Sequence, residues 1–189
     1  MPPAAGARCF GEGDPLYERY HDEEWGRPVT DERGVFERLS LEAFQSGLSW
    51  RTILAKRPAF RAAFADFDPD VVAGFGDEDR ARLLADAGIV RNRLKVDATI
   101  ANARAVLELR ETGEDLAAVV WAHAEPPGAR PAPPAFADLP ALTPASTALA
   151  KELKARGLRF VGPTTAYALM QAIGLVNDHL VTCHRYAQV

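Results

Sequence analysis

Two cysteines and two histidines near opposite ends of the chain are the first residues that could do chemistry. Cys9 and His21 lie early in the sequence, and His179 and Cys183 lie near its last residue. A helix over residues 177–186 would place His179 and Cys183 on one face, because they are four positions apart. Two thiolates and two imidazoles are typical of a closed zinc site, which leaves no open position for a substrate.

The spacing of these four residues also allows other interpretations. Cys9 and His21 are too far apart to form a tight ligand pair, and His184 could compete as a ligand. Buried cysteines and histidines satisfied by hydrogen bonds would give the same pattern. One disulfide between Cys9 and Cys183 is possible in principle, but a chain that looks cytosolic favours metal binding or inert burial.

The segment Gly157-Leu-Arg-Phe-Val-Gly-Pro-Thr164 is typical of a tight turn between two helices. Backbone N–H groups at such a turn suit phosphate oxygens, and the candidate DNA-binding residues are Phe160, Val161, Gly162 and Thr164. Residues 143–189 carry five Lys/Arg and two acids, a local charge of +3 in a chain of net charge −4. This asymmetry permits a DNA-facing side. The alternative is a solvated amphipathic helix followed by an ordinary turn.

Aromatic residues surround one glutamate in the first third of the sequence. A carboxylate among aromatic rings can hold a flat, positively charged base, because the rings stack on it and the acid accepts its N–H groups. The alternative is that the aromatic residues fill the core and the glutamate faces water. The residues concerned are Tyr17, Tyr20, Trp25, Glu42 and Trp50.

Helix caps and apolar spacing of three and four residues predict that helices position all of these side chains. The chain is therefore predicted to be all-α. A proline-rich stretch over 125–134 is predicted to be a loop, since proline lacks the backbone donor. One predicted helix begins at 68–69. The other predicted helices span 31–46, 77–88, 91–110, 116–123, 143–156 and 163–173.

Composition excludes several classes of protein. The chain has 189 residues, of which 25% are charged and 48% are hydrophobic. These values argue against a disordered chain, a polycationic coat and a disulfide-rich secreted scaffold. The opening residues lack the apolar core of a signal peptide, and no apolar run is long enough for a membrane span. We expect a soluble, cytoplasmic protein that forms one helical unit over 1–189.

Four ordered motifs resemble 3-methyladenine DNA glycosylase I. They are Asp14-Pro-Leu-Tyr-x-x-Tyr-His-Asp-x-Glu-Trp-Gly26, Leu41-Glu-x-x-Gln-x-Gly-Leu-Ser-Trp50, Gly88-Ile-Val-Arg-x-Arg-x-Lys95 and Phe160-Val-Gly-x-Thr-x-x-Tyr-x-x-Met-Gln-Ala-x-Gly-Leu-Val-Asn-Asp-His179. The resemblance extends from Cys9 to Cys183, and the proline-rich loop alone is private to this sequence. Such long, separated motifs are highly specific.

The resemblance implies a helix-hairpin-helix DNA glycosylase fold, with the hairpin unit over about 144–176. It also implies one structural zinc ion that joins the terminal segments 9–21 and 179–183. It assigns the zinc to Cys9, His21, His179 and Cys183, and the pocket for the damaged base to Glu42, Tyr17, Tyr20 and Trp50, with Trp25 close by. The implied partner is double-stranded DNA containing alkylated adenine, bound by a monomer associated with the nucleoid.

The implied reaction is hydrolysis of the N-glycosidic bond of 3-methyladenine, with Glu42 complementing the charge of the base. Thr164 stands where related glycosylases with lyase activity have a nucleophilic lysine, so strand cleavage is not expected. Asn177 stands where the superfamily has an aspartate that assists water, and Asp178 is one position away. An amide cannot act as a general base, which fits a substrate already activated by its own charge.

Two other functions remain open from the sequence. One is a non-catalytic helix-hairpin-helix DNA-binding module with a structural metal, in which the aromatic residues belong to the core. The other is a metal-dependent hydrolase, which would need an open coordination position and a water-activating acid near the metal.

Overall fold

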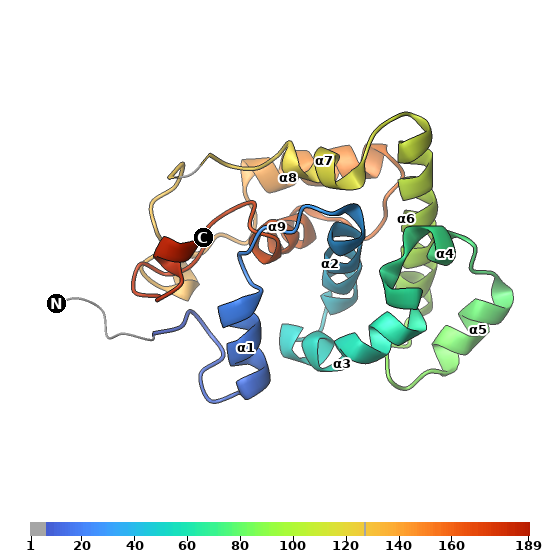
Figure 1. Cartoon of the computed structure of the whole chain (residues 1–189), viewed down its shortest axis with the longest axis horizontal. Coiled ribbons are helices and arrows are strands. Elements are labelled where there is room, and N and C mark those ends of the chain that lie inside the picture. The colour runs from blue at the N-terminus through green and yellow to red at the C-terminus, as the bar shows by residue number, and fades with distance from the viewer. Residues whose placement is uncertain (1–6, 127) are drawn as a thin grey trace.

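Helices joined by short connections make up the computed structural model, which describes residues 7–126 and 128–189 (Figure 1). No β-strand occurs in that part of the chain, which confirms the predicted all-helical class. The elements are α1 (Pro15–Glu23), α2 (Glu32–Gln45), α3 (Trp50–Ala63), η1 (Ala65–Phe67), α4 (Pro69–Ala73), α5 (Asp77–Ala85), α6 (Arg93–Glu111), α7 (Leu116–Trp121), η2 (Phe136–Asp138), α8 (Pro144–Ala155), α9 (Pro163–Ala172) and η3 (Tyr186–Gln188).

Side-chain caps start helices where the sequence predicts them. The Asp31 carboxylate accepts a hydrogen bond from the Gly34 amide at 2.7 Å and begins α2. Thr143 and Ser146 bond each other reciprocally at the start of α8, where Pro144 needs no donor. The predicted helices that became α4, α5, α6, α7 and α9 are confirmed. The described residues of the predicted loop over 125–134 form no helix or strand, as predicted, and Pro127 lies outside the described residues.

Two helices, α1 and α3, were absent from the prediction. Both begin at side-chain caps, Asp14 for α1 and Ser49 for α3. Pro58 lies inside α3, and an internal proline normally marks a helix boundary. The nine residues of α1 carry Tyr17 and Tyr20, whose side chains belong to the site described below.

The helix considered over residues 177–186 does not form. This segment is irregular, and only Tyr186–Gln188 forms a short 3-10 turn. The Asn177 side chain accepts the His179 amide at 3.2 Å, and the Cys183 amide bonds to the Leu180 carbonyl at 2.8 Å. These short-range bonds hold a turn in place of a helical ladder.

Helix α2 lies at the centre of the molecule (Figure 1) and packs against α3, α6, α7 and α9. Its fully buried residues are Val35, Phe36, Leu39, Leu41 and Phe44. Every residue from 38 to 44 is buried, so the second half of α2 is enclosed by other elements. Glu42 therefore lies in the interior because α2 does.

The turn between α8 and α9 is fixed to α6 by Asn102, a buried residue. Its Nδ2 donates to the Arg159 carbonyl at 3.1 Å, and its Oδ1 accepts the Arg159 amide at 2.7 Å. The Asn102 amide thus satisfies both the N–H and the C=O group of Arg159 and holds the α8–α9 hairpin in place.

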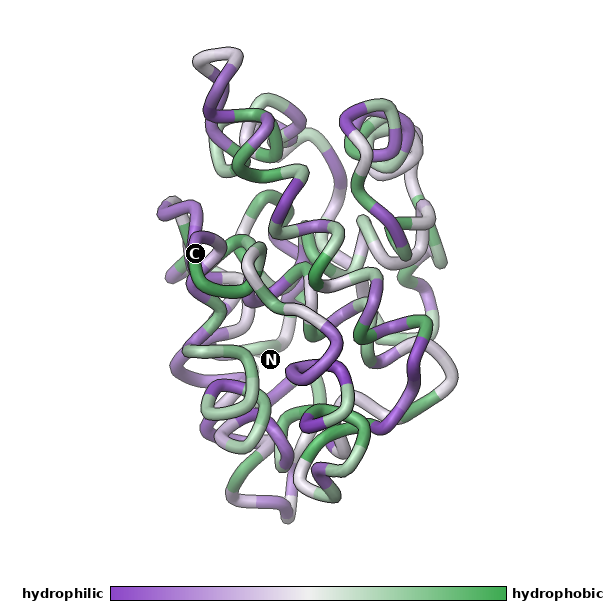
Figure 2. The backbone as a smooth tube through the Cα atoms, turned by 90° about the vertical axis from the view of Figure 1, so that its right-hand side faces the viewer, coloured by the Kyte–Doolittle hydropathy of each residue, from purple (hydrophilic) through white to green (hydrophobic). Residues whose placement is uncertain are grey.

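The first described residues and the C-terminal segment lie on the same side of the molecule (Figure 1). The His184 amide donates to the Ala7 carbonyl at 3.1 Å, so the two ends are in direct contact. Hydrophilic and hydrophobic residues alternate along the backbone tube (Figure 2). In keeping with this pattern, none of the described helices has the length and apolar character needed to cross a membrane.

Candidate active site

A cavity of about 280 Å³ opens beside α2 and brings together all five residues that the sequence singled out as a base pocket. Its walls come from α1, α2, α3 and α9, with further residues from the segment before α1, the α1–α2 connection and η2. The five residues are Tyr17, Tyr20, Trp25, Glu42 and Trp50.

Five other residues line the same cavity and were missed by sequence reasoning. Phe10 follows the first cysteine, and Gln45 and Gln171 lie inside two of the quoted motifs, so a signal for them existed. Phe136 follows the proline-rich loop, and nothing in its sequence context indicated a role. The full set is Phe10, Gln45, Phe136, Ala168 and Gln171.

Aromatic rings pack edge to face and at a tilt around the cavity. The Phe10 ring centre is 4.9 Å from that of Tyr17 and 5.0 Å from that of Trp25. The Tyr20 and Trp50 ring centres are 5.4 Å apart. The indole Nε1 of Trp50 is buried and has no hydrogen-bond partner among the described residues. The ring of Trp50 therefore lines the cavity while its N–H group points into the protein interior.

Glu42 is the acidic group of this cavity. Its residue is 5% exposed, and no hydrogen bond reaches its carboxylate from the part of the chain that the structure describes. Burial raises the pKa of Glu42 to about 8, and the nearby Arg38 opposes that rise only in part. The carboxylate therefore has no adequate counter-ion within the protein.

Arg38, the arginine whose charge acts on Glu42, forms its ion pair with a different carboxylate. Arg38 and Arg57 both donate to Glu24, with N–O distances of 2.6 Å. Burial would raise the pKa of Glu24, but the hydrogen bonds from Arg57 and then Arg38 hold it at about 2. Because these guanidinium groups neutralise Glu24, no ion pair among the described residues neutralises Glu42, and its pKa of about 8 keeps the group mainly protonated at neutral pH. A cation that enters the cavity would favour the ionised form of Glu42.

The tyrosines of the cavity are held in their protonated form. Burial, and next the charge of Glu42, raise the pKa values of Tyr17 and Tyr20 above the ordinary value. Their hydroxyls thus remain hydrogen-bond donors at neutral pH.

The Cys/His cluster forms a compact group of four ligand atoms, all within 4.8 Å of one another. Sγ of Cys183 is 3.4 Å from Nε2 of His21 and 3.5 Å from Nδ1 of His179, and Sγ of Cys9 is 3.5 Å from the same Nδ1. A tetrahedron around zinc, built from the usual Zn–S and Zn–N lengths, has S–N edges of about 3.5 Å. The donor set and its spacing therefore fit a zinc ion.

Neighbouring groups orient the two imidazoles of the cluster. Nδ1 of His21 lies 2.8 Å from the Asp22 carboxylate, and Nε2 of His179 lies 3.2 Å from the Trp25 carbonyl. Each contact leaves the other ring nitrogen facing the cysteines, as in sites where an outer acceptor fixes a metal-binding histidine. His184 lies outside this group and contacts Asp22 and the Ala7 carbonyl.

Burial affects the protonation of the cluster strongly. It raises the pKa of Cys9 to about 12 and lowers the pKa of His179 to about 4. A thiolate at this position therefore requires a cation beside it. Gly26 makes room for the His179 ring, since a Cβ there would lie 2.9 Å from Nε2, and its φ of +77° also favours glycine.

The α8–α9 hairpin presents only part of the predicted DNA-binding set to solvent. Phe160 is 39% exposed, with a left-handed φ of +56°, and Thr164 is exposed. Gly162 caps α9 without a side-chain bond, and the first amides of a helix have no partner within it. Val161 is fully buried, so its main chain alone can reach a phosphate.

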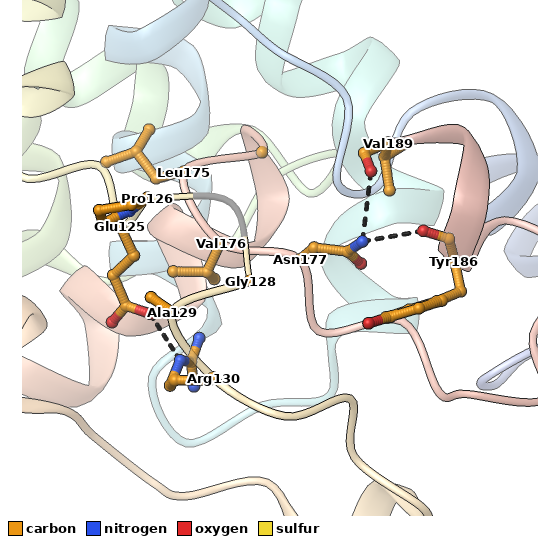
Figure 3. A pocket seen from close by; sticks show the side chains of 11 residues that line it. Glu125, Pro126, Gly128, Ala129, Arg130, Leu175, Val176, Asn177, Tyr186 and Val189 are labelled. Carbon is orange, nitrogen blue, oxygen red and sulfur yellow. Dashed lines mark hydrogen bonds and ion pairs between the residues drawn. The ribbon is translucent and has the colours of Figure 1, made fainter.

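Asn177 and Asp178 are both engaged away from the cavity. Nδ2 of Asn177 donates to the Tyr186 carbonyl at 2.9 Å and to the Val189 carbonyl at 3.3 Å (Figure 3). Asp178 is 4% exposed and accepts donors from Tyr167, Gln171 and Arg130. Neither side chain lines the cavity.

Comparison with known families gives the class of protein to which this fold and cavity belong. Residues 10–186 match the model of the methyladenine glycosylase family. The match covers nearly the whole chain, and the chain belongs to that family.

Individual relatives and solved structures are consistent with membership of this family. DNA-3-methyladenine glycosylase 1 of Escherichia coli (strain K12) is 49% identical over 173 residues, which are 92% of either chain. A crystal structure of 3-methyladenine DNA glycosylase I matches with a TM-score of 0.88 and 48% identity, covering 94% of this chain and 98% of that one. A single-residue variant of 3-methyladenine DNA glycosylase I in complex with 3-methyladenine matches with a TM-score of 0.85 and 34% identity over 93% and 94% of the two chains.

Proposed function

We propose that this protein is a monofunctional DNA glycosylase that hydrolyses the N-glycosidic bond of 3-methyladenine in alkylated double-stranded DNA. The observation that carries the proposal is a buried carboxylate, Glu42, without a counter-ion in a cavity lined by aromatic rings. Relatives that cover most of this chain bear the name of this activity, and one of them has a structure with 3-methyladenine.

Charge explains the choice of substrate. Methylation at N3 gives adenine a positive charge, which both weakens the bond to deoxyribose and matches the unpaired Glu42. Rings of Tyr17, Tyr20 and Trp50 stack around the base once it leaves the duplex, and base stacking on aromatic side chains contributes about 1–3 kcal/mol per base. A neutral base brings no compensating charge, so its entry leaves the carboxylate unpaired.

Water attack needs no dedicated base in this scheme. Asn177 holds the C-terminal segment, and Asp178 is saturated with donors. We infer that the departing base, held by Glu42 as it leaves, provides most of the driving force for hydrolysis. No lysine follows Lys154 in the sequence, so a Schiff-base strand cleavage has no nucleophile in the hairpin.

DNA binding is assigned to the α8–α9 hairpin. Main-chain amides of Val161 and Gly162 suit phosphate oxygens on one side of the damaged nucleotide, with Thr164 adding a hydroxyl and Phe160 an exposed ring.

A structural zinc ion is part of the proposal. Cys9, His21, His179 and Cys183 would hold it, and when bound it supplies four closed bonds that join the terminal segments. Four protein ligands leave no open position, which disfavours a metal-dependent hydrolase. The protein is proposed to act as a monomer, and the substrate favours an intracellular location at the nucleoid.

The test is release of free base from methylated double-stranded DNA, with the products identified by chromatography. We expect 3-methyladenine to be released, and we expect oligonucleotides that carry uracil or hypoxanthine to stay intact over the same time course. Salt-dependent DNA binding without any base release would favour the non-catalytic binding module instead.

A further inference from the structure

Gln171 connects the base cavity to a buried carboxylate that has no part in the scheme above. It lies on α9 and lines the cavity. Its Nε2 donates to Oδ2 of Asp178 at 2.8 Å. The amide therefore faces two environments, the cavity and the interior around Asp178.

Asp178 is surrounded by donors. Arg130 donates to its Oδ1 at 3.0 Å, and the Tyr167 hydroxyl donates to its Oδ2. Arg130 also bonds the Tyr167 hydroxyl at 3.0 Å and Glu125 at 2.5 Å. Figure 3 shows Arg130 beside Glu125 on the proline-rich loop, which approaches the segment with Val176 and Asn177. The proline-rich loop thus contacts, through Arg130 and Asp178, the residue Gln171 that lines the base cavity.

These contacts fix the orientation of the Gln171 amide. Its oxygen and nitrogen have nearly the same shape, so only hydrogen bonds decide which way the group points. A carboxylate only accepts, and it therefore requires the Nε2 side of Gln171. Oε1 is left as the free polar atom of a side chain that lines the cavity, and no hydrogen bond from the described residues reaches it.

We propose that Gln171 is a specificity-determining residue whose Oε1 accepts the exocyclic amine of a methylated adenine, and that Arg130 is a positioning residue acting on it through Asp178. The inference rests on the proposed function. Adenine has an amine donor at C6, whereas guanine has a carbonyl acceptor there. An acceptor held in place by Asp178 therefore favours 3-methyladenine and opposes 3-methylguanine, because two acceptors would face each other without a proton.

The first test measures release of both bases by the Gln171→Met variant, which keeps the size of the side chain and loses the acceptor. We expect kcat/KM for 3-methyladenine to fall about tenfold while 3-methylguanine release stays constant or rises, so that the ratio of the two falls about tenfold or more. Equal losses on both bases, or an unchanged ratio, would overturn the inference.

The second test concerns Arg130, whose side chain is 30% exposed on a loop. Arg130→Gln should lower the same selectivity ratio by a smaller factor, and Arg130→Lys should restore part of it because it keeps the charge beside Asp178. Arg61→Gln is the matched control, since it breaks an ion pair with the half-buried Glu37 far from this network. A ratio in Arg130→Gln equal to that of the control would remove Arg130 from the proposal.

The proposed function and the role of Gln171 can be refuted separately. A wild-type protein that releases no 3-methyladenine refutes the proposed function. An active wild-type protein whose selectivity is unaffected by Gln171→Met refutes only the role of Gln171. Thermal melting of each variant separates loss of folding from loss of selectivity, because a merely structural role would lower both activities together.

Discussion

At the scale of single residues, Glu42 lowers the stability of the fold while it provides the chemistry of the site. Removing a carboxylate from water without a partner is unfavourable, and the protein uses both nearby arginines for Glu24 instead. This arrangement lowers stability and creates a place for a cation. The conflict leads to two predictions for the same substitution.

Glu42→Gln should keep the fold and lower excision of 3-methyladenine. The amide keeps the shape but provides no negative charge for the cationic base, and loss of one such electrostatic partner typically costs about 100-fold in rate. Release of labelled base from methylated DNA measures the effect, with Glu37→Gln, at a carboxylate outside the cavity, as control. Unchanged release would show that the carboxylate is incidental.

The same variant should be more stable than the wild type at alkaline pH. Burial raises the pKa of Glu42 from 4.5 to about 8, so the folded protein holds a proton between these values that the unfolded chain has lost. The free energy of unfolding of the wild type therefore falls as pH rises through this window, by an amount on the order of a few kcal/mol. Denaturant unfolding should show that the free energies of unfolding of the variant and the wild type differ more at pH 8.5 than at pH 5. Parallel profiles of wild type and variant would contradict the burial of an unpaired carboxylate.

At the scale of elements, the end of α2 depends on a lysine from α6. Nζ of Lys95 donates to the carbonyls of Phe44 and Ser46 at 2.8 and 2.6 Å, and the residue is 7% exposed. A cation at a helix C-terminus satisfies carbonyls that have no helical partner and opposes the helix dipole. The lysine thereby fixes the end of the helix that presents Glu42.

Lys95→Met should lower the free energy of unfolding by about 2 kcal/mol, because it leaves the buried Phe44 carbonyl and the more exposed Ser46 carbonyl without a charged donor. Lys56→Met is the matched control. Lys56 also donates to two carbonyls, those of Ala87 and Gly88, but from a more exposed position, and its loss should cost less than about 1 kcal/mol. Equal losses in denaturant unfolding would mean that burial of Lys95 does not matter.

Helix positions were predictable wherever a cap side chain and an apolar period coincided, as at Asp31 and Thr143. The helix with Pro58 was not, because an internal proline normally marks a helix boundary, whereas α3 continues through this exposed proline and buries Leu54 before it and Phe60 after it. The four Cys/His residues lie together as the sequence suggested, although the chain around His179 forms a turn and not the helix considered there. Phe136 joins the cavity from a connection with no periodicity, and only the folded chain reveals it.

At the scale of the whole molecule, the Cys/His cluster ties segments that are more than 150 positions apart in sequence, through contacts such as that between Cys9 and His179. It also touches the base cavity, since the ring centres of Trp25 and His179 are 4.6 Å apart. Joining distant segments restricts the unfolded chain and adds the free energy of metal binding to folding.

Elemental analysis should therefore find about one zinc ion per chain. Cys183→Ala should lose this ion and lower Tm by about 10 °C or more, with a smaller effect on base affinity at a temperature where the variant is folded. His123→Gln, which affects an imidazole paired with Glu152 outside the cluster, should retain the ion. A metal-free wild-type protein of full stability would refute the structural role of zinc.

The walls of the cavity come from segments far apart in the sequence, from Phe10 to Gln171. A ribosome therefore makes Glu42 long before it makes the last wall. Until α9 emerges from the exit tunnel, the nascent chain has an acidic side chain but no enclosed site for a base. A chain that ends before α9 lacks Ala168 and Gln171 and therefore has an incomplete wall around Glu42.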